Sequence, residues 1–448
     1  MELAIKIFQF ILSISILVIL HELGHFLPAK WFKTKVEKFY LFFDPWFSVV
    51  KKKVGETEYG IGWLPFGGYV KIAGMVDESM DTEQLKQPAQ PWEFRAKPAW
   101  QRLIIMLGGV TVNFFLAWII YGCLSFFNGE TVFDSTKEDV QMNYTNVAKA
   151  MGFQDGDKIL KVDGKTQNNL DKLSLDILLS DEITVLRGGK EVTFPTNDDG
   201  KALAFRDENP KAFLTPRYPA VIDSIYNPKT AEAGLKVGDQ IVSVDGKRIN
   251  YYDEFQGVVK NNAGKDINVE VSRAGTIQPL VLSVSKEGTL GLASFKYLEK
   301  FAETKHFNFF ESIGRGFTRS IESLTYQVKQ FKLVFNRKVQ GYKKVGGPLA
   351  IIKNMPVDKA KDGSVSIDWT MFWSFTAMFS VWLAFLNLIP IPGLDGGHVI
   401  FTLYEMIVGK PVPQKVLENA QMVGVIFLLG LMLLIFGADI FKIFTNKL

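Results

Sequence analysis

The residues with the clearest potential for chemistry lie at the end of the first apolar stretch, where residues 21–25 read HELGH. On a helix, His21 and His25 lie one turn apart on the same side, so both imidazoles can bind one zinc ion. Glu22 beside them is the general base of this pattern, which takes a proton from the attacking water. The alternative is a polar contact between membrane helices. The chain has only four histidines and two form this motif, which favours the metal site.

A catalytic zinc site needs a third protein ligand, and a candidate stretch, NLIPIPGLDGGHVIF, occupies residues 387–401. Its prolines and glycines exclude a regular helix, and irregular backbone at membrane depth must pack in protein or line a cavity. Asp395 and His398 both lie in this stretch, and either side chain can be the third ligand. We favour Asp395, because it lies within the break, where the backbone can direct it at the metal. A kinked span with a helix-capping Asp would explain the motif without a metal.

Four apolar segments are about long enough to cross the core of a bilayer. They are Leu3–Leu20, Leu103–Phe127, Met371–Ile389 and Met422–Phe441. The net charge of +4 is too small to indicate nucleic acid as a partner, and the single cysteine, Cys123, excludes a disulfide framework. We therefore expect a multi-pass α-helical protein whose surroundings are the lipid bilayer.

Charged residues beside the spans predict the orientation of the chain. The loop after the first span is rich in lysine, and the loop after the second span begins with acidic residues. Cytoplasmic loops carry the excess of lysine and arginine, so we expect the first loop to be cytoplasmic and the second to be outside. Four spans then place both termini outside, although Lys442 and Lys447 disfavour that topology.

The segment between the second and third spans contains a repeat. Residues 152–164 (GFQDGDKILKVDG) and 234–246 (GLKVGDQIVSVDG) share seven of thirteen positions at an offset of 82 residues. Each copy ends in Asp-Gly after alternating apolar residues, which is a strong turn signal. This predicts two tandem domains rich in short strands. The pattern resembles the PDZ domain in its permuted form, which implies peptide binding by strand addition; the alternative is two structural β-domains with closed grooves.

Three further segments have recognisable patterns. Glycines alternate with large apolar residues over 55–74, which disfavours a helix and predicts a β-hairpin dipping toward the membrane. Residues 77–98 are polar with three prolines and predict a surface loop. From Phe310 to Phe335, apolar residues recur every three or four positions with Lys and Arg between them. This predicts an amphipathic helix, which packs on protein or lies on the membrane surface; we favour packing.

Taken together, the motifs resemble the site-2 protease family of intramembrane zinc metalloproteases (peptidase M50). The resemblance rests on HELGH at the end of the first span and on Asn-x-x-Pro-x-Pro-x-Leu-Asp-Gly, residues 387–396, in a later span. The two PDZ-like domains between spans two and three make the chain similar to the RseP-type regulator-of-sigma-E proteases. The implied fold has about four transmembrane helices, a membrane-associated β-hairpin and two tandem extracytoplasmic PDZ-like domains.

The resemblance also implies roles for individual residues. It assigns the zinc ligands to His21, His25 and Asp395, the catalytic base to Glu22, and binding of the substrate backbone to Asn387.

A second part of the resemblance concerns LPFGGYVK, residues 64–71, which is similar to the β-loop of the family that contacts extended substrate. It implies substrate contacts at Gly67, Gly68 and Tyr69. The segments LGGVTVNF (107–114) and VGGPLAI (345–351) are also similar to family segments, and we expect them to provide close packing.

The implied domain division has five parts. Residues 1–127 hold spans one and two with the β-loop, 128–210 and 211–300 are the PDZ-like domains, 301–366 form an amphipathic and juxtamembrane region, and 367–448 hold spans three and four.

The implied function is cleavage of peptide bonds within or near transmembrane segments of single-span proteins, such as anti-sigma factors or remnant signal peptides, in the bacterial inner membrane. The PDZ-like domains, on the periplasmic side, would filter these substrates. Two other functions are considered: a non-catalytic scaffold that binds peptides through the PDZ-like pair, and a metal or proton transporter. Transporters usually repeat their membrane part, whereas the repeat here lies outside the predicted spans.

Overall fold

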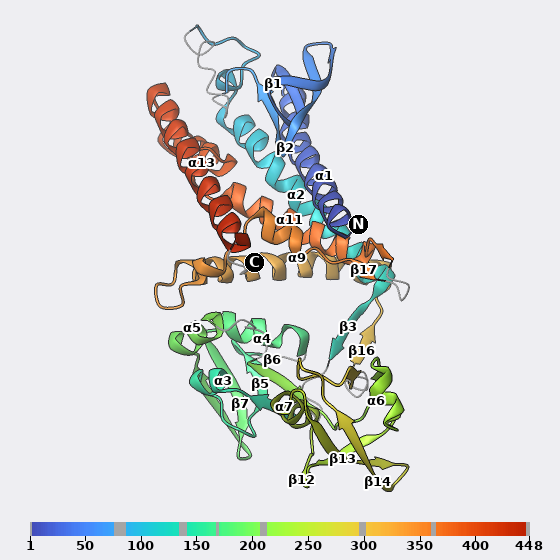
Figure 1. Ribbon diagram of the computed structural model, residues 1–448. Coiled ribbons are helices and arrows are strands. Elements are labelled where there is room, and N and C mark those ends of the chain that lie inside the picture. The colour runs from blue at the N-terminus through green and yellow to red at the C-terminus, as the bar shows by residue number, and fades with distance from the viewer. Residues whose placement is uncertain are drawn as a thin grey trace. The chain divides into compact units, whose positions relative to one another are not determined.

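The computed structural model describes residues 2–75, 87–133, 141–166, 170–206, 213–294, 302–359 and 364–444. The chain divides into two compact units. One unit contains residues 1–129, 306–328 and 345–448, and the other contains residues 130–305 and 329–344. Figure 1 shows the long helices of the first unit and the strand-rich second unit.

The four predicted spans are helices long and apolar enough to cross a membrane. They are α1 (Glu2–Trp31), α2 (Ala99–Asn128), α11 (Trp369–Leu388) and α13 (Gln414–Phe444). Helix α1 continues through HELGH and past Pro28 to Trp31. Hydrogen bonds between small polar side chains join the helices, as between Ser13 and Thr376 (3.0 Å).

Helices α1 and α2 approach very closely at a pair of glycines. A Cβ atom on Gly24 would lie 2.4 Å from the carbonyl oxygen of Gly108, and one on Gly108 would lie 1.9 Å from that of Gly24. Because any side chain here would push the two backbones apart, the glycines set the distance between the helices. This contact explains the glycines of LGGVTVNF as the packing residues that the sequence predicts.

The chain breaks after α11, as the prolines predict. The expectation that residues 387–401 contain no regular helix, with Asp395 inside the break, is wrong from Asp395 onward, because Gly396 and Gly397 pack closely within a helix that the sequence analysis does not identify. This helix, α12 (Asp395–Val408), begins at Asp395. Helix α13 holds the break in place: Gln421 accepts a hydrogen bond from the N–H of Gly393 (3.2 Å), and a Cβ on Gly424 would lie 1.6 Å from the Pro392 oxygen. The irregular backbone is therefore packed in protein, as its depth requires.

The VGGPLAI segment leads into the short helix α10 (Pro348–Lys353) and contacts α13. Asp439, fully buried on α13, accepts hydrogen bonds from the backbone N–H groups of Gly347, Leu349 and Ala350 at 2.9–3.2 Å. The carboxylate thus satisfies the free donors at the start of α10.

A β-hairpin of the first unit consists of β1 (Val36–Val54) and β2 (Thr57–Ile72). The expectation of a hairpin within 55–74 is therefore wrong in its extent, because the turn lies at residues 55–56 and the first strand is 36–54. Residues 38–41 of β1 lie between two parts of β2: they pair with residues 68–71 on one side and with residues 58–61 on the other. Among the described residues, 68–72 pair only with 36–41, so this part of β2 is an edge of the sheet.

The predicted surface loop 77–98 is correct only in part. Residues 77–86 lie outside the described residues. Near its end, however, Glu93 and Phe94 are buried, with Phe94 beginning the short 3-10 helix Phe94–Ala96. Phe94 packs with Ala29, Val36 and Ile105 in a core shared by α1, β1 and α2.

The second unit contains two β domains, each with its own hydrophobic core. The first has a four-stranded sheet in the order β6 (Lys165–Thr166), β5 (Lys158–Val162), β7 (Glu182–Arg187), β8 (Lys190–Pro195). The second repeats this order with β12 (Lys247–Arg248), β11 (Gln240–Val244), β13 (Asp266–Arg273) and β14 (Thr276–Ser283).

The remaining elements of this unit are short helices and strand pairs. The helices are α3 (Asn146–Ala150), α4 (Leu170–Leu179), α5 (Asp198–Arg206), α6 (Pro228–Glu232) and α7 (Tyr252–Asn261). The strand pairs are β4 (Gln141–Tyr144) with β9 (Leu214–Arg217), β10 (Ser224–Ile225) with β15 (Leu292–Ala293), and β3 (Glu130–Phe133) with β16 (Ala302–Lys305). In the first unit, β17 (Asp358–Lys359) pairs with β18 (Val365–Ser366).

The Gly-Asp of each repeat forms the same buried ion pair in both domains. The fully buried side chains of Asp157 and Asp239 bind Arg187 and Arg273 through two hydrogen bonds each, at 2.6–2.8 Å. Each arginine also donates to the carbonyl of the glycine that begins its repeat. A buried carboxylate requires such pairing, which accounts for the recurrence of Gly-Asp in the sequence.

The amphipathic segment is helix α9 (Phe309–Phe335), as predicted. In the first unit it packs on α2, where Trp118 donates to the carbonyl of Ile313 (2.7 Å) and a Cβ on Gly316 would lie 2.6 Å from the Trp118 oxygen. The predicted apolar positions nevertheless stay largely exposed: Phe310 is 81% exposed and Phe335 is 69% exposed. Packing on protein therefore covers only part of the predicted apolar face.

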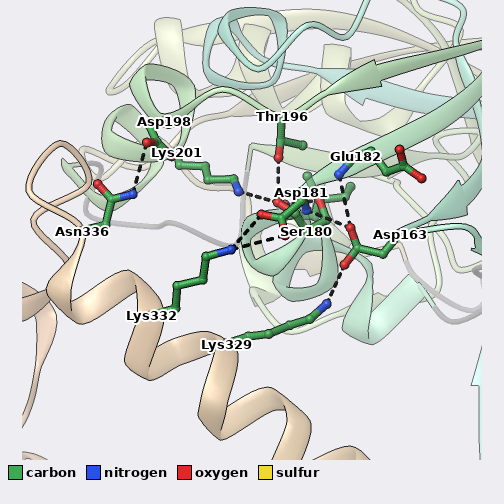
Figure 2. Close-up of polar contacts among 11 residues, drawn as sticks. Asp163, Ser180, Asp181, Glu182, Thr196, Asp198, Lys201, Lys329, Lys332 and Asn336 are labelled. Atoms are coloured by element: carbon green, nitrogen blue, oxygen red, sulfur yellow. Dashed lines mark hydrogen bonds and ion pairs between the residues drawn. The ribbon is translucent and has the colours of Figure 1, made fainter.

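The last turns of α9 belong to the second unit and contact the first β domain through polar groups. Lys329 forms an ion pair with Asp163 (2.5 Å), and Lys332 forms one with Asp181 (3.2 Å) (Figure 2). Asn336 donates to Asp198 (3.1 Å). Close by, the buried Lys201 donates to the carbonyl of Ser180. These contacts join α9 to the loops that end β5 and α4.

Candidate active site

The histidines of HELGH direct one nitrogen each toward the same point. Both side chains are buried on α1, and their Nε2 atoms are 3.3 Å apart. The opposite nitrogen of His25, Nδ1, lies 2.8 Å from the carbonyl oxygen of Ile105 on α2. Since a carbonyl only accepts, Nδ1 of His25 carries the proton and Nε2 has a free lone pair for a metal.

Asp395, the first residue of α12, completes a triangle with the two histidines. Its Oδ2 lies 3.3 Å from Nε2 of His21 and 3.3 Å from Nε2 of His25. A tetrahedral zinc ion with bonds of about 2.0–2.1 Å separates its ligand atoms by about 3.3–3.4 Å. Oδ2 is buried and has no hydrogen-bond donor among the described residues, and a carboxylate oxygen in that state requires a cation. The three side chains therefore fit a zinc ion.

His398 and Asn387 lie beside this triangle without being part of it. Among the described residues, the group able to hold a metal contains His21, His25 and Asp395, and not His398. His398 lies one turn after Asp395 and lines the same cavity. The side-chain nitrogen of Asn387 lies 3.3 Å from Nε2 of His21, so its amide is next to the site.

Glu22, next to His21 on α1, faces the cavity that the edge segment of β2, including Val70, also lines. Glu22, the triangle and the β2 segment 67–72 line one cavity of about 680 Å³. That this segment of the hairpin shares a cavity with Glu22 is not predicted by spacing alone, because no local side-chain pattern records which distant strand will line the site.

Gly67, Gly68 and Tyr69 all line the same cavity. Gly68 permits β2 to approach α1, since a Cβ there would lie 2.7 Å from a methyl carbon of Val18. The Tyr69 hydroxyl donates to Asp44 (2.8 Å), and its ring stacks on Tyr40, so this side chain is fixed within the hairpin.

Sequence reasoning missed Asn113 on α2, which is fully buried and contacts His21. Its side-chain nitrogen lies 3.1 Å from Nδ1 of that histidine. The available signal was a single amide in an otherwise apolar span, one turn after the glycine pair 108–109.

Comparison with known proteins identifies the family to which these features belong. Residues 9–431 match peptidase family M50. The chain belongs to this family. Its M50 relatives include proteins named as zinc metalloproteases, so the triangle lies in a zinc-dependent protease.

Several relatives match the chain along nearly its entire length. The regulator of sigma-E protease RseP of Escherichia coli is 28% identical over 462 residues, which cover 98% of both chains. A Clostridium perfringens protein whose assigned name is that of a zinc metalloprotease is 28% identical over 435 residues, covering 96% of this chain and 97% of its own. The regulator of sigma E protease of Haemophilus influenzae is 26% identical over 448 residues, covering 94% and 96%.

Proposed function

We propose that the chain is an intramembrane zinc endopeptidase in which His21, His25 and Asp395 hold the metal and Glu22 is the general base. The observation that carries the proposal is the triangle of ligand atoms, 3.3 Å on each side, in one cavity with Glu22. Because His21 and His25 lie within an apolar helix able to cross a membrane, we place the chemistry at membrane depth.

In the proposed reaction, water attacks the carbonyl carbon of the scissile peptide bond. A bound zinc ion supplies Lewis acidity, which favours deprotonation of water and polarises a carbonyl. The Glu22 carboxylate takes the proton of the attacking water and returns it to the leaving amine nitrogen. The Asn387 amide lies beside the same atoms and donates to the substrate backbone, which holds the scissile bond in place.

The substrate must be extended at the point of cleavage, because the carbonyls of a helix are shielded by its own hydrogen bonds. The segment 68–72 of β2 is an edge that lines the cavity, so it can pair with one extended strand of substrate. Gly67 and Gly68 leave space for that strand, and Tyr69, fixed by Asp44, forms part of the wall. Strand pairing compensates for the helix hydrogen bonds that the substrate loses.

We assign to the two β domains the role of PDZ-like filters on the periplasmic side of the bacterial inner membrane. The repeated sheet order and the paired Asp157–Arg187 and Asp239–Arg273 contacts support a duplicated domain. The relatives named regulators of sigma E suggest single-span substrates such as anti-sigma factors, and remnant signal peptides have the same single-span character.

The deciding experiment compares proteolysis by the parent and by Glu22→Gln, each reconstituted in liposomes with a tagged single-span substrate. We expect cleavage by the parent, none by the variant, and zinc bound to both proteins. Glu418→Gln, the same change on α13 away from the cavity, is the matched control and should cleave normally. Equal cleavage by parent and Glu22→Gln would contradict the proposal and favour a binding scaffold.

A further inference from the structure

The two histidines of the triangle differ in what orients them. Nδ1 of His25 faces a backbone carbonyl, which is an acceptor by its chemistry. Nδ1 of His21 instead faces the side chain of Asn113, at 3.1 Å from its nitrogen. A neutral imidazole has one proton, and if Nε2 faces the metal then Nδ1 must donate. A donor opposite an amide NH₂ is unfavourable, so the amide in this orientation leaves the Nδ1 proton of His21 without an acceptor.

The other atom of the Asn113 amide resolves this conflict. Its Oδ1 is buried and has no hydrogen-bond partner among the described residues. The oxygen and nitrogen of an amide have nearly the same shape, so a rotation of 180° exchanges them at no steric cost. After this rotation Oδ1 accepts the proton of His21 Nδ1. One change therefore gives the imidazole an acceptor and the buried oxygen a donor.

The surrounding helices hold Asn113 in this position. Its backbone carbonyl accepts a hydrogen bond from the Ser380 hydroxyl of α11 at 2.7 Å. One turn earlier on α2, a Cβ on Gly109 would lie 2.8 Å from Nδ1 of His21 and 2.5 Å from Nε2 of His25. Helix α2 can therefore lie against both imidazoles only because Gly109 lacks a side chain.

We propose that Asn113 is a positioning residue that accepts the Nδ1 proton of His21 and thereby keeps Nε2 available for zinc. The inference rests on the proposed ligand set and extends it to a residue that touches a ligand and not the metal. Outer partners of this kind typically change metal affinity by about 10- to 100-fold.

The test measures zinc affinity of the purified full-length protein in detergent, by competition with a chelator. Asn113→Leu keeps the volume and removes the acceptor, and we expect it to bind zinc about 10- to 100-fold more weakly. Asn113→Asp keeps an oxygen acceptor, and this variant should bind zinc with an affinity close to that of the parent. Asn128→Leu makes the same change at the exposed end of α2, away from the triangle, and is the matched control that should bind zinc like the parent.

A purely structural role for Asn113 predicts a different pattern. It would lower the thermal stability of the metal-free Asn113→Leu protein while leaving zinc affinity and the visible spectrum of bound cobalt unchanged. Parent-like zinc affinity in Asn113→Leu would overturn the proposal, as would equal weakness in the Leu and Asp variants. Failure of the ligand set itself has another signature: the parent and His21→Ala would then bind zinc equally.

Discussion

At the scale of single residues, the sequence predicts chemistry well where the chemistry depends on local spacing. HELGH places His21 and His25 on one helical face without any knowledge of the rest of the fold. The choice between Asp395 and His398 could not be made this way, since both lie in one broken stretch. It depends on the course of the chain after the break, where α12 begins at Asp395 and places its Oδ2 3.3 Å from Nε2 of both histidines.

The buried pair Asp239–Arg273 makes the stability of the second β domain dependent on pH. Burial raises the pKa of Asp239, but hydrogen bonds from Arg273 and the Lys236 backbone outweigh burial and hold it below the ordinary value of 3.8. The carboxylate therefore contributes stability that is complete above the unfolded pKa and is lost as the pH falls through the lower folded value.

We expect Arg273→Met to lower the melting temperature of this domain by several degrees at neutral pH, because the buried Asp239 loses its partner. The difference from the parent should shrink as the pH falls below the ordinary aspartate pKa of 3.8 and through the lower folded value, because Asp239 then becomes protonated even in the folded chain. Calorimetry of the full chain measures both effects. Arg248→Met, an exposed arginine of β12, is the control, and an equal loss in both variants would contradict this account.

At the scale of elements, the four spanning helices were predictable from apolar length, whereas α12 and the first strand of the hairpin were not. Residues 36–54 contain Asp44-Pro45 and three consecutive lysines, and this pattern does not predict one continuous strand. The strand forms because tertiary partners supply what local preference lacks: Asp44 binds the Tyr69 and Ser48 hydroxyls, and positive φ angles at Phe42 and Trp46 bend the chain around it. Such contacts leave no periodic signal in the sequence.

The crossing of α1 and α2 should control the metal site. We expect Gly109→Ala to weaken zinc binding by at least about 10-fold, because its Cβ would lie within 2.5 Å of His25 Nε2 and displace the ligand. Gly430→Ala on α13 introduces the same methyl group where nothing lies within 4 Å, and it should bind zinc normally. Chelator competition compares the two. If both variants bind zinc like the parent, the helices do not set the ligand geometry.

The polar contacts at the end of α9 should fix that end to the first β domain. The Asp163 carboxylate is partly buried, yet Lys329 and the N–H groups of Asp181 and Glu182 hold its pKa below the usual range. We expect Lys329→Met to increase the rate of amide hydrogen exchange in residues 329–336, because the ion pair that holds this end of α9 against Asp163 is lost. Lys305→Met changes a lysine of β16 instead and should leave exchange in 329–336 as in the parent; unchanged exchange in Lys329→Met would contradict the assignment.

At the scale of the whole molecule, the proposed metal ligands and the two β-domain cores lie in different compact units. Zinc should therefore stabilise one unit without the other. A ligand present at 100 times its dissociation constant adds about 2.7 kcal/mol to the stability of the unit that binds it. Heating the full chain with and without zinc, while following each unit by hydrogen exchange, should show protection in α1 and α12 and none in β5 or β11. Equal protection in both units would indicate that they unfold together.

Asp395 lies 370 positions after His25, and this spacing has a consequence for biosynthesis. Ribosomes add about 5–20 residues per second, so roughly 20–75 seconds pass between synthesis of the first two ligands and the third. During that interval the nascent chain already has Glu22 and both imidazoles, but it lacks the carboxylate that completes the triangle. With the proposed ligand set, a protease assembled in this order cannot cut its neighbours in the membrane until α12 has been synthesised.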